Sequence, residues 1–254
     1  MNADEDPRIE AMTSAEISQR ISGGARTAIL PLAAIEQHGP HLPLSVDSDH
    51  ADELAVRIAH RLGNALVLPT VRVGYSPHHL SFPGTMSLRA STLEDVCLDY
   101  CSHLAAHGFT HVVLFSGHIG NYPIMRDFAA RLTQALAPEL EVIVFTDARA
   151  ILDAWRVAAG SIGLADRVGG HADIAESSVM LVLHPEKVRV DRVASGYPGV
   201  VDDVVLRRVH AEGVHALSTN GVLGDPSGMS EAIGHAALEA VADLIVTHTR
   251  AHGG

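Results

Sequence analysis

The sequence is poor in aromatic residues. Aromatic side chains make up only 4% of the 254 residues, whereas hydrophobic residues as a whole reach 47%. The core must therefore be built from alanine, valine, leucine and isoleucine, which is the usual make-up of a parallel sheet covered by helices. A chain of this length and apolarity can bury a sizeable core, and it suits one large domain better than two small ones.

Cysteines are also scarce, and long apolar runs are absent. Cys97 and Cys101 lie four residues apart in a stretch with helical periodicity, where a disulfide has poor geometry. We expect two buried thiols, which fit a reducing compartment. The N-terminus lacks the apolar segment of a signal peptide, and no run reaches the roughly 18 apolar residues of a membrane span. We therefore expect a cytoplasmic protein that does not insert into membranes.

Clusters of Lys and Arg are missing as well. Lysine is almost absent, and the formal net charge is −12, from 18 basic and 30 acidic residues. This composition argues against nucleic acid as a partner, because nucleic acid is bound through a basic surface. An acidic surface favours solubility instead. Histidine is abundant, with 17 residues.

The sequence does contain a regular alternation of β-type runs and helical periodicity. Strands are expected at 27–33, 65–74, 111–117 and 141–147. Helices are expected at 48–62, 91–108, 123–136 and 230–252. This alternation predicts βαβ units and a mostly parallel sheet with helices on both faces.

The ends of two expected helices carry capping signals. Ser48 or Asp49 would begin the first helix, and Ser91 with Glu94 would form a capping box on the second. We expect one domain over 1–254, with an N-terminal segment at 1–24 and a partly irregular region at 185–229.

Ligand-type side chains gather where the first and third strands should end. "EQHGPHL" (36–42) follows the first strand, and "SGHIGN" (116–121) ends the third. In parallel α/β sheets, sites collect beyond the carboxyl ends of the strands. We predict four metal ligands from these loops and from the start of the next helix: Glu36, His38, Asp47 and His118.

The spacing of these residues supports a shared centre. Glu36 and His38 are two residues apart, so both point to one side of an extended segment. Asp47 lies just before an expected helix, and glycines flank His118 closely enough to admit a metal or a substrate. Two carboxylates with two imidazoles suit zinc or manganese rather than a thiolate site. Taken singly, Glu36 could cap a backbone and His38 could be an ordinary loop histidine.

Four segments resemble the signature segments of the creatininase (creatinine amidohydrolase) family, in the same order. They are "EQHGPHLPLSVD" (36–47), "HLSFPGTMSL" (79–88), "SGHIGN" (116–121) and "HADIAESS" (171–178). The tail "GVLGDPSGMSEAIG" (221–234) is also similar. The resemblance implies a three-layer α/β/α sandwich with a mostly parallel central sheet and a homohexamer. It also implies two divalent metal ions per chain, zinc or manganese, with iron or magnesium as further candidates.

The resemblance assigns roles to individual residues. It places Glu36, His38, Asp47 and His118 on ligand positions, with Asp47 bridging the metals. It makes Glu176 a fifth ligand and a catalytic residue, and it makes His171 the group that contacts substrate or moves protons.

The sequence departs from the family pattern at two informative places. Gly120 stands where creatininase has a glutamate, which makes creatinine a doubtful substrate and leaves Glu176 for the second metal. Asp173 stands where glycine is usual, and it either adds a ligand or faces solvent.

These features predict a metal-dependent amidohydrolase. A metal-bridging hydroxide would attack the carbonyl of a small or cyclic amide, His171 would protonate the leaving nitrogen, and backbone amides in 117–121 would hold the oxyanion. The loop 76–88 would shape the pocket, although Pro83-Gly84-Thr85 is equally typical of an ordinary turn. The candidates for substrate binding are Tyr75, His78, His79, Thr85, Gly120 and Asn121.

Other interpretations remain open at the level of sequence. The chain could be a peptidase that trims a modified precursor peptide, a formamide deformylase, or a metal-binding assembly protein that has lost catalysis. Trp155, the only tryptophan, lies in a helical stretch and serves either core or interface packing or a substrate lid.

Overall fold

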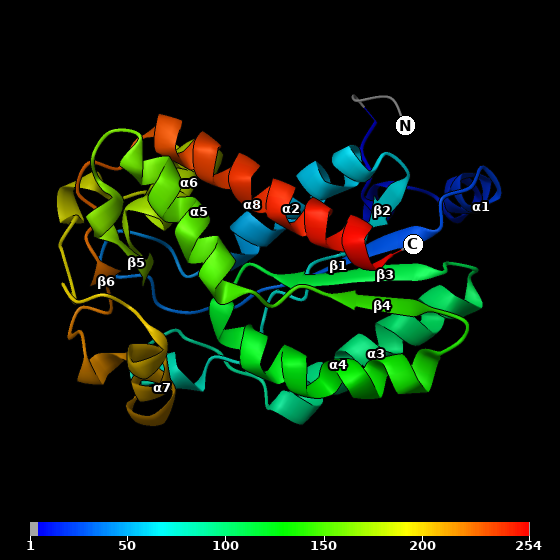
Figure 1. Ribbon diagram of the computed structural model, residues 1–254, viewed down its shortest axis with the longest axis horizontal. Helices are drawn as coiled ribbons and strands as arrows, with labels where there is room; N and C mark the ends of the chain where they lie inside the picture. The colour runs from blue at the N-terminus through cyan, green and yellow to red at the C-terminus, as the bar shows by residue number, and fades with distance from the viewer. Residues whose placement is uncertain (1–4, 254) are drawn as a thin grey trace.

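The computed structural model describes residues 5–253, the side chain at 203 excepted, and is built around a four-stranded parallel sheet (Figure 1). The strand order is β2-β1-β3-β4, and every pairing is parallel. The strands are β1 (Thr27–Leu32), β2 (Ala65–Val67), β3 (His111–Ser116) and β4 (Glu141–Val144). The central strands β1 and β3 are almost fully buried, as strands between two helical layers must be.

Helices cover both faces of this sheet (Figure 1). Helices α2 (Val46–Leu62) and α8 (Glu231–His252) lie on one face, and α3 (Ala90–Ala106) and α4 (Tyr122–Leu136) lie on the other. The predicted three-layer α/β/α sandwich with a mostly parallel sheet is therefore confirmed. Their apolar faces bury aliphatic side chains against the strands, which is the expected use of a core poor in aromatics.

The remaining helices lie at the two ends of the sheet. Helix α1 (Ser14–Ser22) lies at the end where β1 begins, whereas α5 (Ala148–Gly160), α6 (Ile174–Leu183) and α7 (Asp203–Glu212) lie at the other end (Figure 1). Strands β5 (Val168–His171) and β6 (Leu223–Gly224) form a small antiparallel sheet beyond the main one (Figure 1). Short 3-10 helices occupy Ile9–Ala11, Pro77–His79, Ile119–Asn121, Ala165–Arg167, Pro185–Lys187, Val190–Arg192 and Val214–Ala216. In the described part of the chain, no helix has the length and apolarity needed to cross a bilayer.

The structure confirms the prediction for the two cysteines and decides between the alternatives for Trp155. Cys97 and Cys101 are free thiols on the buried face of α3. Trp155 is 1% exposed in α5, and its ring stacks on that of His50 with centroids 6.1 Å apart. This tryptophan therefore packs in the core and is not a substrate lid.

The predicted strand 65–74 is too long. It leaves the sheet after Val67, because Pro69 has no backbone N–H for the ladder, and only an isolated bridge between Leu32 and Val71 follows.

The predicted helix caps are wrong. Helix α2 begins at Val46 without a side-chain cap, and Ser48 donates instead to the carbonyl of Ala34. Helix α3 begins at Ala90, also without a side-chain cap, because Glu94 is held by Arg131 through two hydrogen bonds. A long-range ion pair thus replaces the expected capping box.

Candidate metal centre

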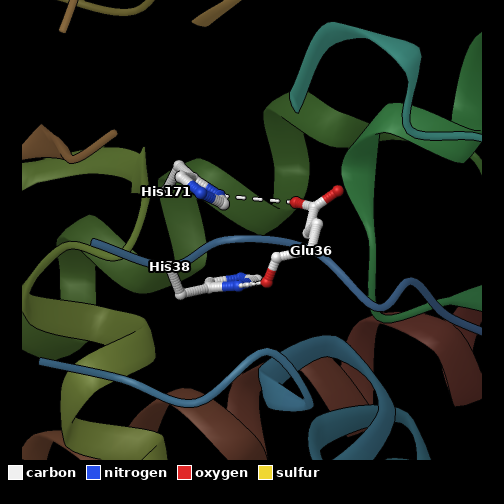
Figure 2. A group of neighbouring side chains, drawn as sticks. All are labelled: Glu36, His38 and His171. Atoms are coloured by element: carbon white, nitrogen blue, oxygen red, sulfur yellow. Dashed lines mark hydrogen bonds and ion pairs between the residues drawn. The ribbon is translucent and has the colours of Figure 1, made fainter. Parts of the chain in front are cut away.

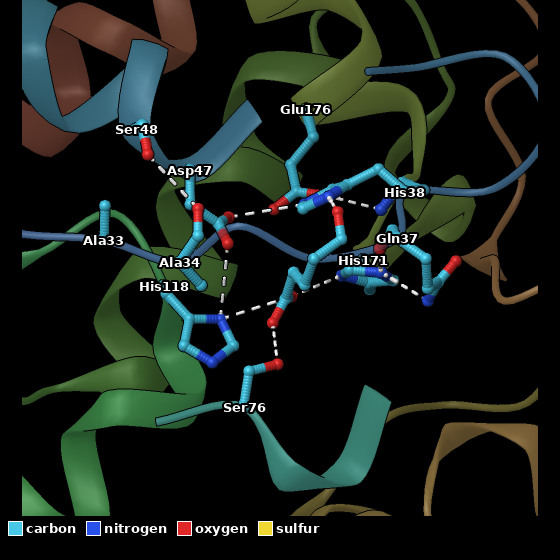
Figure 3. Close-up of polar contacts among 12 residues, drawn as sticks. Ala33, Ala34, Gln37, His38, Asp47, Ser48, Ser76, His118, His171 and Glu176 are labelled. Carbon is cyan, nitrogen blue, oxygen red and sulfur yellow. Dashed lines mark hydrogen bonds and ion pairs between the residues drawn. The ribbon is translucent and has the colours of Figure 1, made fainter. Parts of the chain in front are cut away.

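The predicted ligand residues meet beyond the carboxyl ends of β1 and β3 (Figure 3). Glu36 and His38 come from the segment after β1, and His118 follows β3. Asp47 lies inside the first turn of α2 rather than before it, and Glu176 lies in the first turn of α6. Each of these five residues is at most 5% exposed, so tertiary folding buries them together.

Asp47 lies between two imidazoles. Its Oδ1 is 3.3 Å from His38 Nε2, and its Oδ2 is 3.5 Å from His118 Nδ1. Glu36 Oε1 approaches His118 Nδ1 to 3.3 Å, and Glu176 Oε2 approaches His38 Nε2 to 3.6 Å. Asp47 therefore lies between two groups of side chains, Glu36 with His118 and Glu176 with His38. The possible ligand atoms of His38, Asp47 and Glu176 all lie within 4.8 Å of one another.

Backbone carbonyls orient both imidazoles. His38 Nδ1 lies 3.1 Å from the carbonyl of Glu36, and His118 Nε2 lies 3.2 Å from the carbonyl of Tyr75. A carbonyl can only accept, so these nitrogens donate and the opposite nitrogens face the carboxylates. Histidines that bind metals are usually oriented in this way.

Several polar atoms in this cluster are buried without a hydrogen-bond partner among the described residues. They include Glu36 Oε1, His38 Nε2 and Asp47 Oδ2, which all face the shared centre. Leaving such atoms unpaired costs free energy, and a bound ion would remove that cost. Oxygen and imidazole donors in this ratio fit zinc or manganese.

The carboxylates do not ionise alike. Burial opposes ionisation of Glu36, but the nearby His118 and His79 hold the pKa of that carboxyl well below its usual range. Burial raises the pKa of Glu176 to about 8, since His38 offsets only part of the desolvation. Burial likewise raises the pKa of Asp47.

The two imidazoles between these carboxylates hold their protons tightly. Burial acts to lower the pKa of His38, but Asp47 and Glu176 outweigh it and raise the pKa to about 10. In the same way, Glu36 outweighs burial and raises the pKa of His118 to about 9. Without a cation, protons therefore balance the buried negative charge, and a cation entering here must displace them.

His171, at the end of β5, faces the same centre (Figure 2). Its Nδ1 is 3.6 Å from Glu36 Oε1, and its ring centroid is 4.3 Å from that of His38. Its Nε2 lies 2.7 Å from the carbonyl of Gln37, to which it donates. Burial, together with His38 and His79, holds the pKa of His171 well below its usual range, so the ring is neutral with an accepting nitrogen toward the site.

Two of the predicted substrate contacts, His78 and His79, reach the cluster. Both lie on the 3-10 helix Pro77–His79 and line the cavity above the ligands. His79 Nε2 is 3.4 Å from Glu36 Oε1. The ring of His78 stacks on that of His118 with centroids 5.5 Å apart. Gly120 also lines the cavity.

The other predicted substrate contacts support the site from outside the cavity. Asn121 donates to the carbonyl of Ala33 and accepts from the backbone N–H of Tyr75. Thr85 Oγ1 accepts from the backbone N–H of Gln37. Tyr75, Thr85 and Asn121 are not among the described residues that line the cavity, and these bonds place the loops that carry the ligands.

The predicted oxyanion amides are largely used inside the protein. The N–H groups of Gly117, His118 and Asn121 donate to the carbonyl of Leu32, to Ser116 Oγ and to the carbonyl of His118, respectively. They are not available to a substrate.

Asp173 is neither a ligand nor exposed to solvent. It is 0% exposed and caps α6, where Oδ1 accepts from the N–H groups of Ala175 and Glu176. Its Oδ2 accepts from the N–H groups of Gly169 and Gly170 at 2.8 Å. This residue fixes the helix turn that presents Glu176.

Helix α7 contributes the residues that sequence reasoning missed. Leu206, Val209 and His210 of α7 line the cavity. The ring of His210 meets that of His78 edge-on, with centroids 4.8 Å apart. In the sequence, His210 follows Leu206 by one helical turn, and this spacing could have indicated a helix with one face toward the site. The sequence of 185–229 gave no clear helix or strand, so the spacing was not used.

The fold and this cluster together define a class of α/β enzyme whose site is a buried group of carboxylates and imidazoles at the strand ends. The family model described as creatinine amidohydrolase matches residues 10–249. The chain therefore belongs to the creatininase family, a family of hydrolases.

Known relatives agree with this assignment. The chain is 30% identical over 222 residues to the mycofactocin precursor peptide peptidase of Mycolicibacterium smegmatis, covering 85% of this chain and 81% of the relative. It is 33% identical over 200 residues to the creatinine amidohydrolase of Pseudomonas putida, covering 74% and 75%. A solved structure described as "Creatininase Mn" superposes with a TM-score of 0.75 at 28% identity, covering 97% of this chain and 98% of that one.

Proposed function

We propose that the chain is a dinuclear metal-dependent amidohydrolase that cleaves a C–N bond of a small or cyclic amide. The observation that carries this proposal is the position of Asp47, whose two oxygens face two separate imidazole–carboxylate pairs. The creatinine amidohydrolase among the relatives supports the reaction class. The solved structure described as "Creatininase Mn" supports manganese as the metal.

The donor set divides into two sites. Glu36, Asp47 and His118 would hold one cation, and His38, Asp47 and Glu176 would hold the other. When bound, a pair of divalent cations lowers the pKa of water and polarises the carbonyl under attack.

The chain's own residues handle protons and position the substrate. Neutral His171 presents Nδ1 to the site, where it can accept a proton and return it to the leaving nitrogen. Its other nitrogen is held by the carbonyl of Gln37, which fixes the orientation of the ring. Apolar side chains of Leu152, Val201 and Val214 also line the cavity, and a wall of low polarity strengthens charge interactions within it.

Metal content and hydrolysis test this proposal together. We expect two zinc or manganese ions per chain by elemental mass spectrometry, and metal-dependent hydrolysis within a panel of lactams, formamides and peptides. Glu176→Gln should leave about one ion per chain, whereas the same change at the exposed Glu186 should leave two. Two ions in Glu176→Gln would remove this residue from the ligand set, and metal without turnover on the panel would favour a binding protein.

A peptidase is the second candidate. The mycofactocin precursor peptide peptidase covers 85% of this chain, more than the creatinine amidohydrolase does. Hydrolysis of peptides in preference to lactams and formamides would select this alternative. The homohexamer and the cytoplasmic location remain predictions, and light scattering of the purified protein tests the first.

A further inference from the structure

A second pocket opens directly beside the cavity of the metal centre. It shares Ile119, Leu206 and His210 with the first cavity. Two arginines, Arg126 of α4 and Arg207 of α7, also line it. A substrate bound at the metals can therefore extend past His210 toward two guanidinium groups.

No carboxylate among the described side chains neutralises these two guanidinium groups. Arg126 donates to the carbonyl of Thr146 at 3.1 Å, and among the described side chains neither Arg126 nor Arg207 pairs with a carboxylate. The adjacent Arg208, by contrast, is 2.9 Å from Glu212. In a chain with a net charge of −12, two cations at one pocket that have no carboxylate partner among the described side chains are available for an anionic group.

The first residues of two helices also border this pocket. Tyr122 and Pro123, the first two residues of α4, line it, and so does Ala148, the first residue of α5. Helix N-termini carry partial positive charge. The carboxylate of Asp147 caps α5 by accepting from the N–H of Ala150 at 2.9 Å, so it satisfies one amide of that helix end.

A neighbouring pocket, which shares Ala148 and Leu206 with this one, provides a contrast. Arg149 and Arg156 line it, but both pair with Asp153, at 4.0 and 2.9 Å, and Asp202 lines it too. Its positive charge is therefore offset. An anionic group is attracted to the pocket of Arg126 and Arg207 and not to this one.

We propose that the substrate carries a carboxylate, which Arg126 and Arg207 bind while the amide lies at the metal centre. A guanidinium presents a planar pair of N–H groups that matches a carboxylate. The rings of His118, His78 and His210 form a row between the metal centre and the pocket of the two arginines. A substrate that reaches from one to the other is an elongated amide and not a compact lactam. This inference rests on the proposed function, and it narrows the substrate class.

Binding measurements test the carboxylate site without any turnover. The probes are α,ω-dicarboxylates of five to eight carbons, each compared by calorimetry with the monocarboxylate of equal length, on the manganese-loaded protein. One end can contact the metals and the other the arginines. At least one dicarboxylate should bind roughly threefold to tenfold more tightly than its partner, the range expected for exposed charge pairs.

Matched variants locate the effect. Arg207→Gln and Arg126→Gln should each reduce this preference, whereas Arg208→Gln, one residue away on α7 with the same charge change, should retain it. The proposal is overturned if no dicarboxylate is preferred, if the preference survives in both pocket variants, or if Arg208→Gln reduces it equally. An ω-phosphonate that binds more tightly than the dicarboxylate of equal length would also overturn the choice of a carboxylate.

Hydrolysis separates this inference from the proposed function. For ω-amido acids and the matching neutral diamides, kcat/KM should favour the acid in the wild-type protein, and Arg207→Gln should lower it for the acid alone. Hydrolysis of both substrates at equal kcat/KM would overturn the carboxylate site and leave the amidohydrolase intact. A dicarboxylate preference without hydrolysis of any amide would support the binding site and reject the amidohydrolase.

Discussion

At the scale of single residues, the space around Gly120 limits what the site can hold. A Cβ atom at this position would lie 2.3 Å from His118 Nε2 and 2.7 Å from His78 Cε1. Real Cβ atoms do not approach that closely, so any side chain here must move an imidazole. The absence of a side chain at 120 thus fits a centre whose second carboxylate comes from Glu176.

We expect Gly120→Ala to weaken metal binding by about tenfold or more, because displacing an oriented ligand typically has such an effect. Calorimetric titration of the metal-free protein with manganese measures it. Gly160→Ala is the control, since its Cβ would meet only Ala165 Cβ at an ordinary 3.5 Å. Equal manganese affinity in the two variants would contradict the ligand role of His118.

His171→Ala should retain two metal ions and lower kcat by roughly 10²–10⁴, the usual contribution of a positioned acid or base. The reason is that its Nδ1 faces Glu36 Oε1 at 3.6 Å while Nε2 is held by a carbonyl. Metal analysis and steady-state kinetics check the two parts separately. Loss of one ion would instead make His171 a ligand, since its Nδ1 is close enough to Glu36 and His38 for that role.

At the scale of elements, the turn from β5 into α6 decides where Glu176 points. Asp173 accepts four backbone N–H groups, two from the helix start and two from glycines 169 and 170. Glu176 Oε2 in turn accepts from the N–H of Ala172. The side chain of Glu176 is therefore positioned by the backbone on both sides of the turn.

Asp173→Ala should lower the free energy of unfolding by about 1–3 kcal/mol, because buried N–H groups lose their acceptor. It should also weaken one of the two metal sites. Urea denaturation and metal titration measure these effects. Asp147→Ala, which removes the cap of α5, should destabilise the fold without changing metal affinity at Glu176; if both variants weaken metal binding alike, the cap does not act through Glu176.

At the scale of the whole molecule, the buried cluster couples stability to pH and to metal. The pKa values of His38, His118 and Glu176 are raised to about 10, 9 and 8. Groups with raised pKa values stabilise the fold fully below their ordinary values and lose this contribution as pH rises through the folded values. Burial lowers the pKa of His41 and His50 to about 4. As pH falls below about 6.5, these imidazoles take up protons in the unfolded chain before they do so in the folded protein, so the free energy of unfolding decreases.

The metal-free protein should therefore lose stability between about pH 6.5 and 10, by at least about 1.4 kcal/mol, the equivalent of one pKa unit. Manganese should reduce this loss, since it replaces the protons of His38 and His118. Urea unfolding at pH 6.5, 8 and 9.5, with chelator or with manganese, tests both statements. A metal-free protein whose stability is flat across this range would show that the cluster does not hold these protons.

The sequence by itself determined the alternation of strands and helices and the side chains that follow β1 and β3, since periodicity and strand ends are local properties. It therefore predicted that Glu36, His38 and His118 would meet. It did not determine that α7 would cover the cavity, that Asp173 would cap α6, or that Thr85 and Asn121 would support loops. Those outcomes depend on contacts between residues far apart in the chain, and only the packed tertiary structure decides which buried donor meets which acceptor.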